Sequence, residues 1–289
     1  MKTITGGTGW GRASMLWMLC SLIAAVPAAA NDGAQSAASA PSQPADLPQP
    51  HPLEPLLAMA EQAAERIADH VQDYTCTLVK RERVEGRLLP AETIFAKVRH
   101  VPAAGDERGG CQLYLRFESP RGLRGREILF PAPDADGHLL VRNGGPRLAF
   151  ITLKLEPTCA LAMRGNRYPI SEFGIQRLVE RMLMLGRQEL AYGECLVSNQ
   201  EDVQLEGRRC RVIEVQHPQR RPHFVYHIAR ITIDEELQLP IRFEAYDWPE
   251  DDQQPPPLIE EYTYRDLRLN VGLSDHDFSR EHSDYQFRR

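Results

Sequence analysis

Between Asp73 and His100, strand-favouring residues alternate between two faces on both sides of Glu85-Gly86, in the stretch DYTCTLVKRERVEGRLLPAETIFAKVRH. Alternation with a period of two around a glycine-containing turn is typical of an antiparallel hairpin. One face of such a hairpin packs on a core, and the other faces water or a partner. We therefore expect this hairpin to be part of a larger sheet.

Two segments have helical periodicity instead. From residue 53 to residue 71, apolar side chains recur at three- and four-residue steps and form a single stripe. Residues 173–185 have a broader apolar face, with Ser171 as the expected N-cap and Gly186 or Gly193 as the expected end. Both helices therefore need an apolar surface to cover.

Further strand-like segments follow at short intervals. They span residues 112–118, 126–130, 138–142, 147–155, 202–217, 224–233, 239–247 and 258–269. The order is thus a helix, about five strands, a helix and about four more strands, and two helices are too few to cover both faces of so much sheet. The predicted fold class is α+β, mainly β: a single, highly curved antiparallel sheet (a half-barrel) with the helices packed on its concave face.

The first residues are expected to lie outside this domain. A basic start, an apolar run and an A-x-A site predict that residues 1–30 are a signal peptide cleaved before Asn31. Residues 31–52, rich in Pro, Ala and Ser, are predicted to be a disordered linker. Residues 53–289 would then form a single domain of an exported protein, in the periplasm or cell envelope, with no transmembrane segment after cleavage.

The charge of the chain argues against a nucleic-acid partner. The net charge at pH 7 is −6, and signal cleavage would remove Lys2 and Arg12 but no acidic residue, which leaves −8. Proteins that bind the phosphate backbone normally carry an excess of positive charge. We therefore predict no nucleic acid among the partners.

Metal and catalytic signatures are sparse. Cleavage would leave five cysteines without CxxC spacing: Cys76, Cys111, Cys159, Cys195 and Cys210. One or two disulfides with a free thiol, or several small buried side chains, are equally compatible with them. His223 and His227 lie four apart on a predicted strand without a third ligand, and adjacent Glu260 and Glu261 would face opposite sides of theirs. We predict no metal, no cofactor and no catalytic residue.

Two basic clusters are candidate ligand contacts. Arg81 and Arg83 end the predicted first strand, and Arg164 and Arg167 lie in a predicted loop, residues 163–170, before the second helix. Arginines near a helix N-terminus can hold a phosphate or a carboxylate. The alternative, which we favour, is that they tie the loop to carbonyls and acids of the sheet.

Three blocks, YTCTLVKRERV, LYLRFESP and AMRGNRYPIS, resemble the recurrent blocks of a secreted bacterial domain family, prominent in planctomycetes, that is known only as a domain of unknown function. The resemblance runs from about Glu54 to Phe287. More remotely, the layout is similar to that of lipoprotein-localisation carriers of the LolA/LolB type, which implies a half-open barrel lidded by helices around an acyl-chain cavity. In those carriers an arginine on an early strand latches the lid; Arg81 and Arg83 are both candidates, and no motif selects between them.

The expected function is a periplasmic, non-enzymatic carrier or binding protein for a lipid, a lipoprotein acyl chain or another apolar ligand. The expected cavity residues, with both helices lying across them, are Leu113, Leu115, Phe117, Phe173, Leu178 and Met182. A second hypothesis is an envelope sensor or scaffold that binds another protein through the polar face of the sheet. The third is a hydrolase with an unrecognised site.

Overall fold

The computed structural model describes residues 50–101, 110–131, 136–145, 151–251 and 253–287, which all fall in one compact unit, Pro48–Arg289. The expected signal peptide, its cleavage site and the expected linker up to residue 49 lie outside the described residues.

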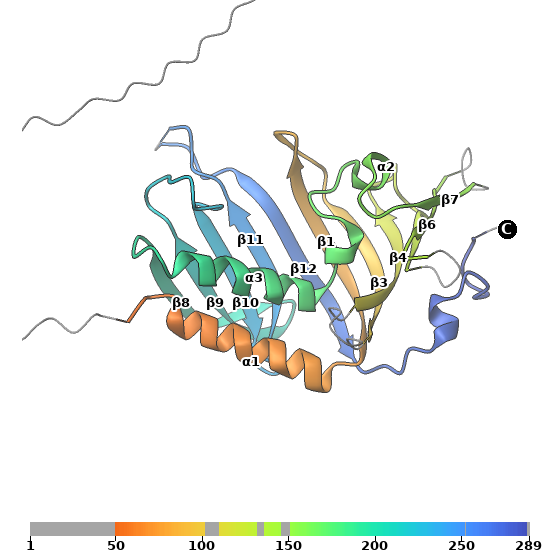
Figure 1. Cartoon of the computed structure of the whole chain (residues 1–289), viewed down its shortest axis with the longest axis horizontal. Coiled ribbons are helices and arrows are strands. Elements are labelled where there is room, and N and C mark those ends of the chain that lie inside the picture. Colours follow the sequence, from red (N-terminus) through yellow and green to blue (C-terminus); the bar gives the residue numbers. More distant parts are fainter. Residues whose placement is uncertain (1–49, 102–109, 132–135, 146–150, 252, 288–289) are drawn as a thin grey trace, which may run out of the picture. The chain divides into compact units, whose positions relative to one another are not determined.

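Within these described residues, twelve strands form one sheet in which every neighbouring pair is antiparallel. They are β1 (Asp73–Val84), β2 (Arg87–Leu88), β3 (Glu92–Val101), β4 (Gly110–Ser119), β5 (Glu127–Phe130), β6 (Leu139–Arg142), β7 (Thr152–Leu155), β8 (Leu196–Leu205), β9 (Arg208–Gln216), β10 (Ile228–Asp234), β11 (Leu239–Tyr246) and β12 (Leu258–Leu269). The spatial order is β7-β6-β5-β4-β3-β1-β12-β11-β10-β9-β8, with β2 paired to β1 alone. The strand β1 therefore joins two meanders at the middle of the sheet (Figure 1).

The predicted hairpin is confirmed. Glu85 and Gly86 both have positive φ, 50° and 78°, as the tight turn between β1 and β2 requires. Beyond that turn β3 pairs with β1. One of the two alternating sets of β1, Tyr74, Cys76 and Leu78, is buried in the main hydrophobic core. Period-two alternation thus separated the two faces correctly.

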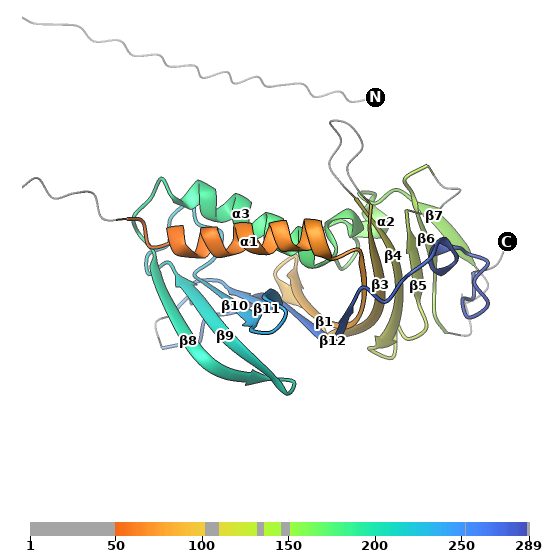
Figure 2. The same ribbon diagram turned by 90° about the horizontal axis from the view of Figure 1, so that it is seen from below.

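Two long helices, α1 (Glu54–His70) and α3 (Ile175–Glu189), lie side by side against the concave face of the curved sheet (Figures 1 and 2). The predicted fold class is therefore confirmed. Neither Gly186 nor Gly193, the two expected ends, terminates α3: the helix runs through Gly186 and ends at Glu189, with Leu190 as its C-cap. A Cβ at Gly186 would lie 2.8 Å from Cδ2 of Leu57, so the glycine permits the close approach of the two helices.

The N-terminus of α3 also differs from the expectation. Ser171 lies in a short 3-10 helix, η1 (Ile170–Glu172), and Gly174 is the N-cap, with φ of 109°. Glycine has no side chain that could cap the helix. Instead the backbone N–H of Ile175 donates a hydrogen bond to the hydroxyl of Tyr74 on β1, at 3.1 Å. The central strand thus caps the helix in place of a local serine.

Several strand boundaries were wrong; the expected strand 224–233, for example, begins only at Ile228 of β10, and the largest error is a missed strand. The segment 202–217 was expected to be a single strand, but it contains a turn at Glu206-Gly207, which separates β8 from β9. The missed strand β8 lies at one edge of the sheet, and most of its residues are exposed. With neither face well buried, it lacks the apolar alternation that reveals the other strands.

The end of the chain covers part of the outer, convex face. After the 3-10 helix η2 (Asp275–Phe278), the ring of Tyr285 stacks on Tyr114 of β4 with 3.7 Å between ring centroids. Nζ of Lys97 lies 2.6 Å from Oδ1 of Asp277. Tyr114 and Tyr285 belong to a second, smaller hydrophobic cluster, which is separate from the main core.

Candidate functional site: a covered cavity on the concave face

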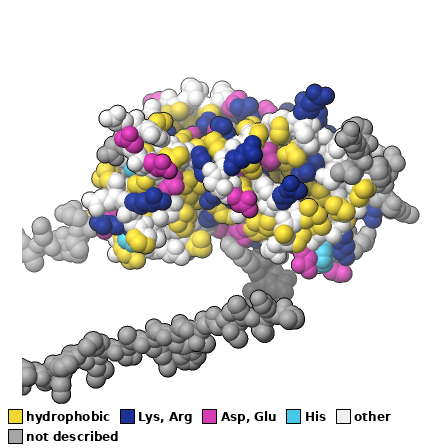
Figure 3. All heavy atoms as spheres, turned by 90° about the horizontal axis from the view of Figure 1, so that it is seen from above, with side chains coloured by type: hydrophobic (Ala, Val, Ile, Leu, Met, Phe, Trp, Pro, Cys, Tyr) yellow, Lys and Arg dark blue, Asp and Glu magenta, His cyan; other side chains and the backbone are white. Residues whose placement is uncertain are grey.

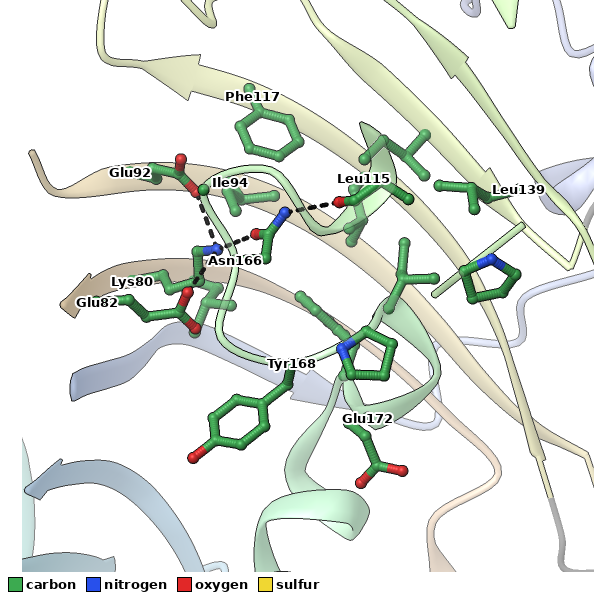
Figure 4. Close-up of a pocket in the computed structure, with 18 of the residues that line it drawn as sticks. Lys80, Glu82, Glu92, Ile94, Leu115, Phe117, Leu139, Asn166, Tyr168 and Glu172 are labelled. Atoms are coloured by element: carbon green, nitrogen blue, oxygen red, sulfur yellow. Dashed lines mark hydrogen bonds and ion pairs between the residues drawn. The ribbon is translucent and has the colours of Figure 1, made fainter. Parts of the chain in front are cut away.

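A cavity of about 500 Å³ lies between one half of the sheet and the segment 157–174 that crosses it. Its sheet-side residues come from β1, β3–β7 and β12, and its cover contains the short helix α2 (Ala160–Met163) and η1. Figure 4 shows the side chains that face this space. The volume is in the range of small-molecule sites, roughly 300–1,000 Å³.

The wall of the cavity is mainly aliphatic and aromatic. Its apolar members on the sheet are Leu78, Ile94, Leu115, Phe117, Ile128, Leu139, Val141, Leu153 and Leu155. Ile128 and Leu153 remain only half-buried although they line the inside of the fold. In a tightly packed core such side chains would be covered, so this half of the sheet is incompletely filled.

The cover is a loop-rich segment rather than a long helix. On α2, Leu161 lines the cavity and is nevertheless 53% exposed, which places it at the rim. Gly165, with φ of 79°, lets the chain turn back toward the sheet. The helix α1 does not line this cavity, contrary to the expectation for residues 53–71. With α3 it instead covers the β9–β11 side of the sheet, where a smaller space of about 90 Å³ remains.

One end of the cavity is polar, and Lys80 is at its centre (Figure 4). Its Nζ donates to Oδ1 of Asn166 in the cover at 2.7 Å and to Oε2 of Glu82 at 3.4 Å. Oε2 of Glu92 lies 3.2 Å from the same Nζ, but the alignment is too poor for a hydrogen bond and this buried oxygen accepts none. Lys80 therefore joins the cover to both acids of the sheet.

A second tie joins the cover to β12. Nε of Arg167 lies 2.9 Å from Oε2 of Glu260, whose residue is fully buried, and Nη1 donates to the carbonyl oxygen of Arg83 at 2.9 Å. The backbone N–H of Arg167 donates to Oε2 of Glu82. Burial, the largest single effect, lowers the pKa of Arg167, but Glu260 together with Tyr168 and Tyr226 outweighs it and the net pKa is raised. The guanidinium thus stays charged and neutralises Glu260.

Three tyrosines complete this network. The hydroxyl of Tyr226 donates to Oε1 of Glu260 at 2.7 Å, Tyr168 lies 3.2 Å from the same oxygen, and Tyr262 donates to Oε1 of Glu82 at 2.5 Å. Burial, followed by the neighbouring carboxylates, raises the pKa of all three hydroxyls. The tyrosines therefore remain hydrogen-bond donors, and both carboxylates are engaged in holding the cover.

The structure gathers most of the expected cavity residues. Leu115, Phe117, Phe173 and Leu178 line the large cavity. Leu113 is fully buried in the adjoining core and does not line it.

The last expected residue, Met182, lies elsewhere. It lines the smaller space between the long helices and the sheet, whereas its neighbour Arg181 lines the large cavity.

The four expected arginines have different surroundings. Arg167 holds the cover, as described above. Arg83 is half-buried, and its Nε donates to the carbonyl oxygen of Leu258 at 2.9 Å. Arg81 is exposed, and its Nε lies 3.4 Å from the carbonyl oxygen of Leu89. Arg164 is exposed and lines the cavity.

Sequence reasoning missed three important polar residues. Glu82 and Glu260 are paired across β1 and β12, and this pairing depends on a register that sequence spacing does not contain. Arg126 lines the cavity at the start of the hairpin strand β5, where it resembles any surface arginine. One available signal was Glu82 itself, an acidic residue within a strand whose other face is apolar.

The remaining candidates do not converge. His223 and His227 precede β10 rather than lying on a strand, and His223 stacks on Tyr192 with 3.7 Å between ring centroids. Within the described ranges, no group of three or more His, Cys, Asp or Glu side chains is placed to hold a metal ion. All five described cysteines are free thiols, so the disulfide alternative is wrong. The described helices include none with the length and hydropathy needed to span a membrane.

The side of the molecule that lies uppermost in Figure 1 has mixed chemistry. On the face shown in Figure 3, apolar side chains reach the surface between basic and acidic ones. A ligand approaching this face meets both signs of charge together with apolar surface.

Several solved structures are similar in fold at low sequence identity. A DUF1329 family protein from Desulfovibrio piger is 15% identical, covering 79% of this chain and 98% of its own, with a TM-score of 0.35. A putative outer membrane lipoprotein-sorting protein domain from Vibrio parahaemolyticus is 15% identical, with coverages of 77% and 95% and a TM-score of 0.34. A LolA superfamily protein from Nitrosomonas europaea is 13% identical, with coverages of 77% and 96% and a TM-score of 0.28.

The MucA/MucB complex of Pseudomonas aeruginosa also matches, at 14% identity, coverages of 77% and 60% and a TM-score of 0.39. Each of these TM-scores is below 0.5. No curated protein matches the sequence. A family model does match, over residues 71–287, and the chain therefore belongs to the family described as protein of unknown function, DUF1571.

Proposed function

We propose that this domain is a non-enzymatic carrier or binding protein for an apolar chain, such as a lipid or a lipoprotein acyl chain, in the cell envelope. The observation that carries the proposal is the cavity of about 500 Å³ with an aliphatic wall. Soluble proteins rarely leave so much apolar surface unpacked without a ligand to cover it.

The size of the cavity fits an acyl chain. At roughly 30 Å³ for a water-sized group, about fourteen methylenes need some 420 Å³. Burying them at about 0.8 kcal/mol each gives a gross gain of about 11 kcal/mol. Association costs at least about 4 kcal/mol, which leaves an affinity near the micromolar range. Such an affinity suits a protein that both takes up and releases its ligand.

The way the cover is held suits reversible access. Asn166 and Arg167 are tied to the sheet by polar contacts at one end of the cavity, whereas Leu161 is exposed at the rim. Polar ties keep the cover in register without filling the space below it. Opening on the α2 side would admit a chain without breaking the buried Arg167–Glu260 pair.

The alternative, an envelope sensor or scaffold, would use the outer face of the sheet. Part of that face, over β4, is already covered by the chain's own Tyr285 and Phe287. This leaves less of the sheet for a partner, so the carrier is the better-supported function. Location in the periplasm rests on the predicted signal peptide, residues 1–30.

The direct test is mass spectrometry of the organic extract from protein purified under native conditions from the envelope fraction. We expect a stoichiometric lipid or fatty acyl species, which unfolding in solvent releases. A co-purifying protein with no lipid would favour the sensor or scaffold. An extract matching that of an unrelated envelope protein prepared in parallel would count against the carrier.

A further inference from the structure

Arg126 is a cationic side chain of the cavity wall whose Nε has no hydrogen-bond acceptor among the described residues. That nitrogen is buried. A buried guanidinium nitrogen without an acceptor is costly, and structures seldom retain one unless something else binds it. The guanidinium carbon lies 5.7 Å from the centre of the Phe117 ring, which is itself part of the wall.

Nearby charge does not satisfy this guanidinium. Burial lowers the pKa of Arg126, and Glu92 is the one charged group that raises it. Glu92 is already ion-paired with Lys80 at 3.2 Å. Glu82 is likewise engaged, by Tyr262 and by the backbone N–H of Arg167. Glu82 is therefore occupied by other donors, whereas Glu92 acts on Arg126 through its charge alone, since its buried Oε2 accepts no hydrogen bond.

The lining as a whole carries an excess of positive charge. Its ionisable residues are Lys80, Arg126, Arg164 and Arg181 on the basic side, and Glu82, Glu92 and Glu172 on the acidic side. The guanidinium carbon of Arg181 lies 3.5 Å from the centre of the Tyr168 ring, and its Nη2 lies 3.9 Å from Oε2 of Glu172. The exposed Arg164 and the half-buried Arg126 are left to face a ligand.

We propose that the cavity takes a single-chain amphiphile with an anionic head, whose carboxylate or phosphate oxygen accepts hydrogen bonds from Arg126. This inference rests on the proposed function of the domain as a carrier. The chain would lie along the aliphatic wall of β4–β7, beside Phe117 and Ile128. A guanidinium matches both oxyanions in geometry, and charge-assisted hydrogen bonds of this kind are the stronger ones. Both a fatty acid and a phosphate monoester would supply the required head.

Displacement of N-phenyl-1-naphthylamine, a neutral apolar probe, from delipidated protein tests this proposal. The competitors share a twelve-carbon chain and differ in the head: dodecanoate, dodecyl phosphate, and the neutral methyl dodecanoate. We expect at least one anion to bind the wild type about tenfold or more tightly than the methyl ester, as one charge-assisted hydrogen bond provides. Whichever of the two anions binds more tightly shows whether the site fits a carboxylate head or a phosphate head.

The variant R126M removes the guanidinium with little change in length. We expect it to lose the anion preference while its affinity for methyl dodecanoate stays within about twofold of the wild type. Its melting temperature without ligand should be unchanged or higher, because an unsatisfied buried donor is removed. The matched control is R124M, which alters an exposed arginine bonded to the carbonyl oxygen of Glu118, and it should behave as the wild type.

The outcomes separate this inference from the function on which it rests. Equal binding of the three competitors by the wild type, or an anion preference that survives in R126M, would overturn the role of Arg126 and leave the carrier intact. A lower melting temperature for R126M together with unchanged preference would show a structural arginine instead. Failure of the probe and of every competitor to bind the wild type would overturn both proposals.

Discussion

Glu82 of β1 and Glu260 of β12 are direct cross-strand partners, and both residues are buried. Two carboxylates placed opposite each other on one face would repel. Tyr262 relieves this, since its hydroxyl lies 2.5 Å from Glu82 and 3.5 Å from Glu260, and Arg167 supplies the positive charge. The pair is thus the sheet-side half of the tie that holds the cover over the cavity.

Replacing Arg167 by alanine should destabilise the domain. The fully buried Glu260 would lose its charge-assisted bond, and a loss of this type costs about 1–3 kcal/mol. Chemical denaturation measures the change in the free energy of unfolding. The control is Arg164→Ala, an exposed residue of the same loop, for which we expect less than about 0.5 kcal/mol. Identical denaturation curves for Arg167→Ala and the wild type would contradict a stabilising contact between Arg167 and Glu260.

The cap of α3 provides a second test. A Cβ at Gly174 would lie 2.9 Å from the hydroxyl of Tyr74, and its φ of 109° is unfavourable for other residues. We therefore expect Gly174→Ala to lower the free energy of unfolding by more than about 1 kcal/mol. Tyr74→Phe removes only the cap to Ile175 and should cost about 1 kcal/mol. If Tyr74→Phe melts as the wild type, the hydroxyl is not the cap.

Acid should weaken the attachment of the C-terminal residues. Burial raises the pKa of Asp277, but hydrogen bonds from Lys97 and Ser274 outweigh it and lower the pKa from 3.8 to about 2. Because the folded-state pKa is depressed, ionised Asp277 contributes stability above pH 4, and this stability is lost as the pH falls through about 2.

The experiment compares the free energy of unfolding of the wild type and Asp277→Asn between pH 2 and pH 5. The wild type should lose more stability over that range, because Asp277→Asn lacks this titrating carboxylate. Asp275→Asn is the control: its carboxylate also pairs with an arginine, Arg99, but the Asp275 side chain is 97% exposed, so solvent screens that pair. Identical pH profiles for Asp277→Asn and the wild type would refute the role of the Lys97 contact.

The cavity wall can be altered from two sides. Phe117→Asp places a charge in the aliphatic wall, and Ile128→Trp fills part of the space. We expect both changes to weaken binding of a fluorescent fatty-acid probe at least tenfold while the far-ultraviolet circular dichroism stays native. Leu196→Trp is the control, because this β8 residue is 59% exposed and outside the cavity lining. Unchanged probe affinity in a folded Ile128→Trp variant would place the ligand elsewhere.

Much of the fold could be predicted because most strands have one buried face. In β4, Leu113, Leu115 and Phe117 belong to the main core, as their spacing indicates. The apolar stripe of α1 was equally visible, since a helix on a sheet needs one continuous apolar face. The strand β8 was missed where this asymmetry is weak.

The candidate site was harder to predict because its key contacts span the chain. Residues Lys80 and Asn166 are 86 positions apart, and Arg167 and Glu260 are 93 apart. Register across β1 and β12 places Glu82 opposite Glu260, and the cover carries Asn166 and Arg167 to that point of the sheet. Hydrophobic periodicity encodes neither the register nor the path of the cover. The cover, residues 157–174, looked like an ordinary loop because its role depends on what lies beneath it. Tyr74 similarly replaced the expected cap from a strand distant in sequence.

Equilibrium binding to delipidated wild-type protein tests the central claim most directly. The protein is stripped of bound lipid, checked for native circular dichroism and titrated with a fluorescent fatty acid. Binding of about one probe per chain near micromolar affinity, displaced by unlabelled acyl chains, is the result that a 500 Å³ carrier cavity predicts. Folded, delipidated protein that leaves the probe fluorescence unchanged would contradict it.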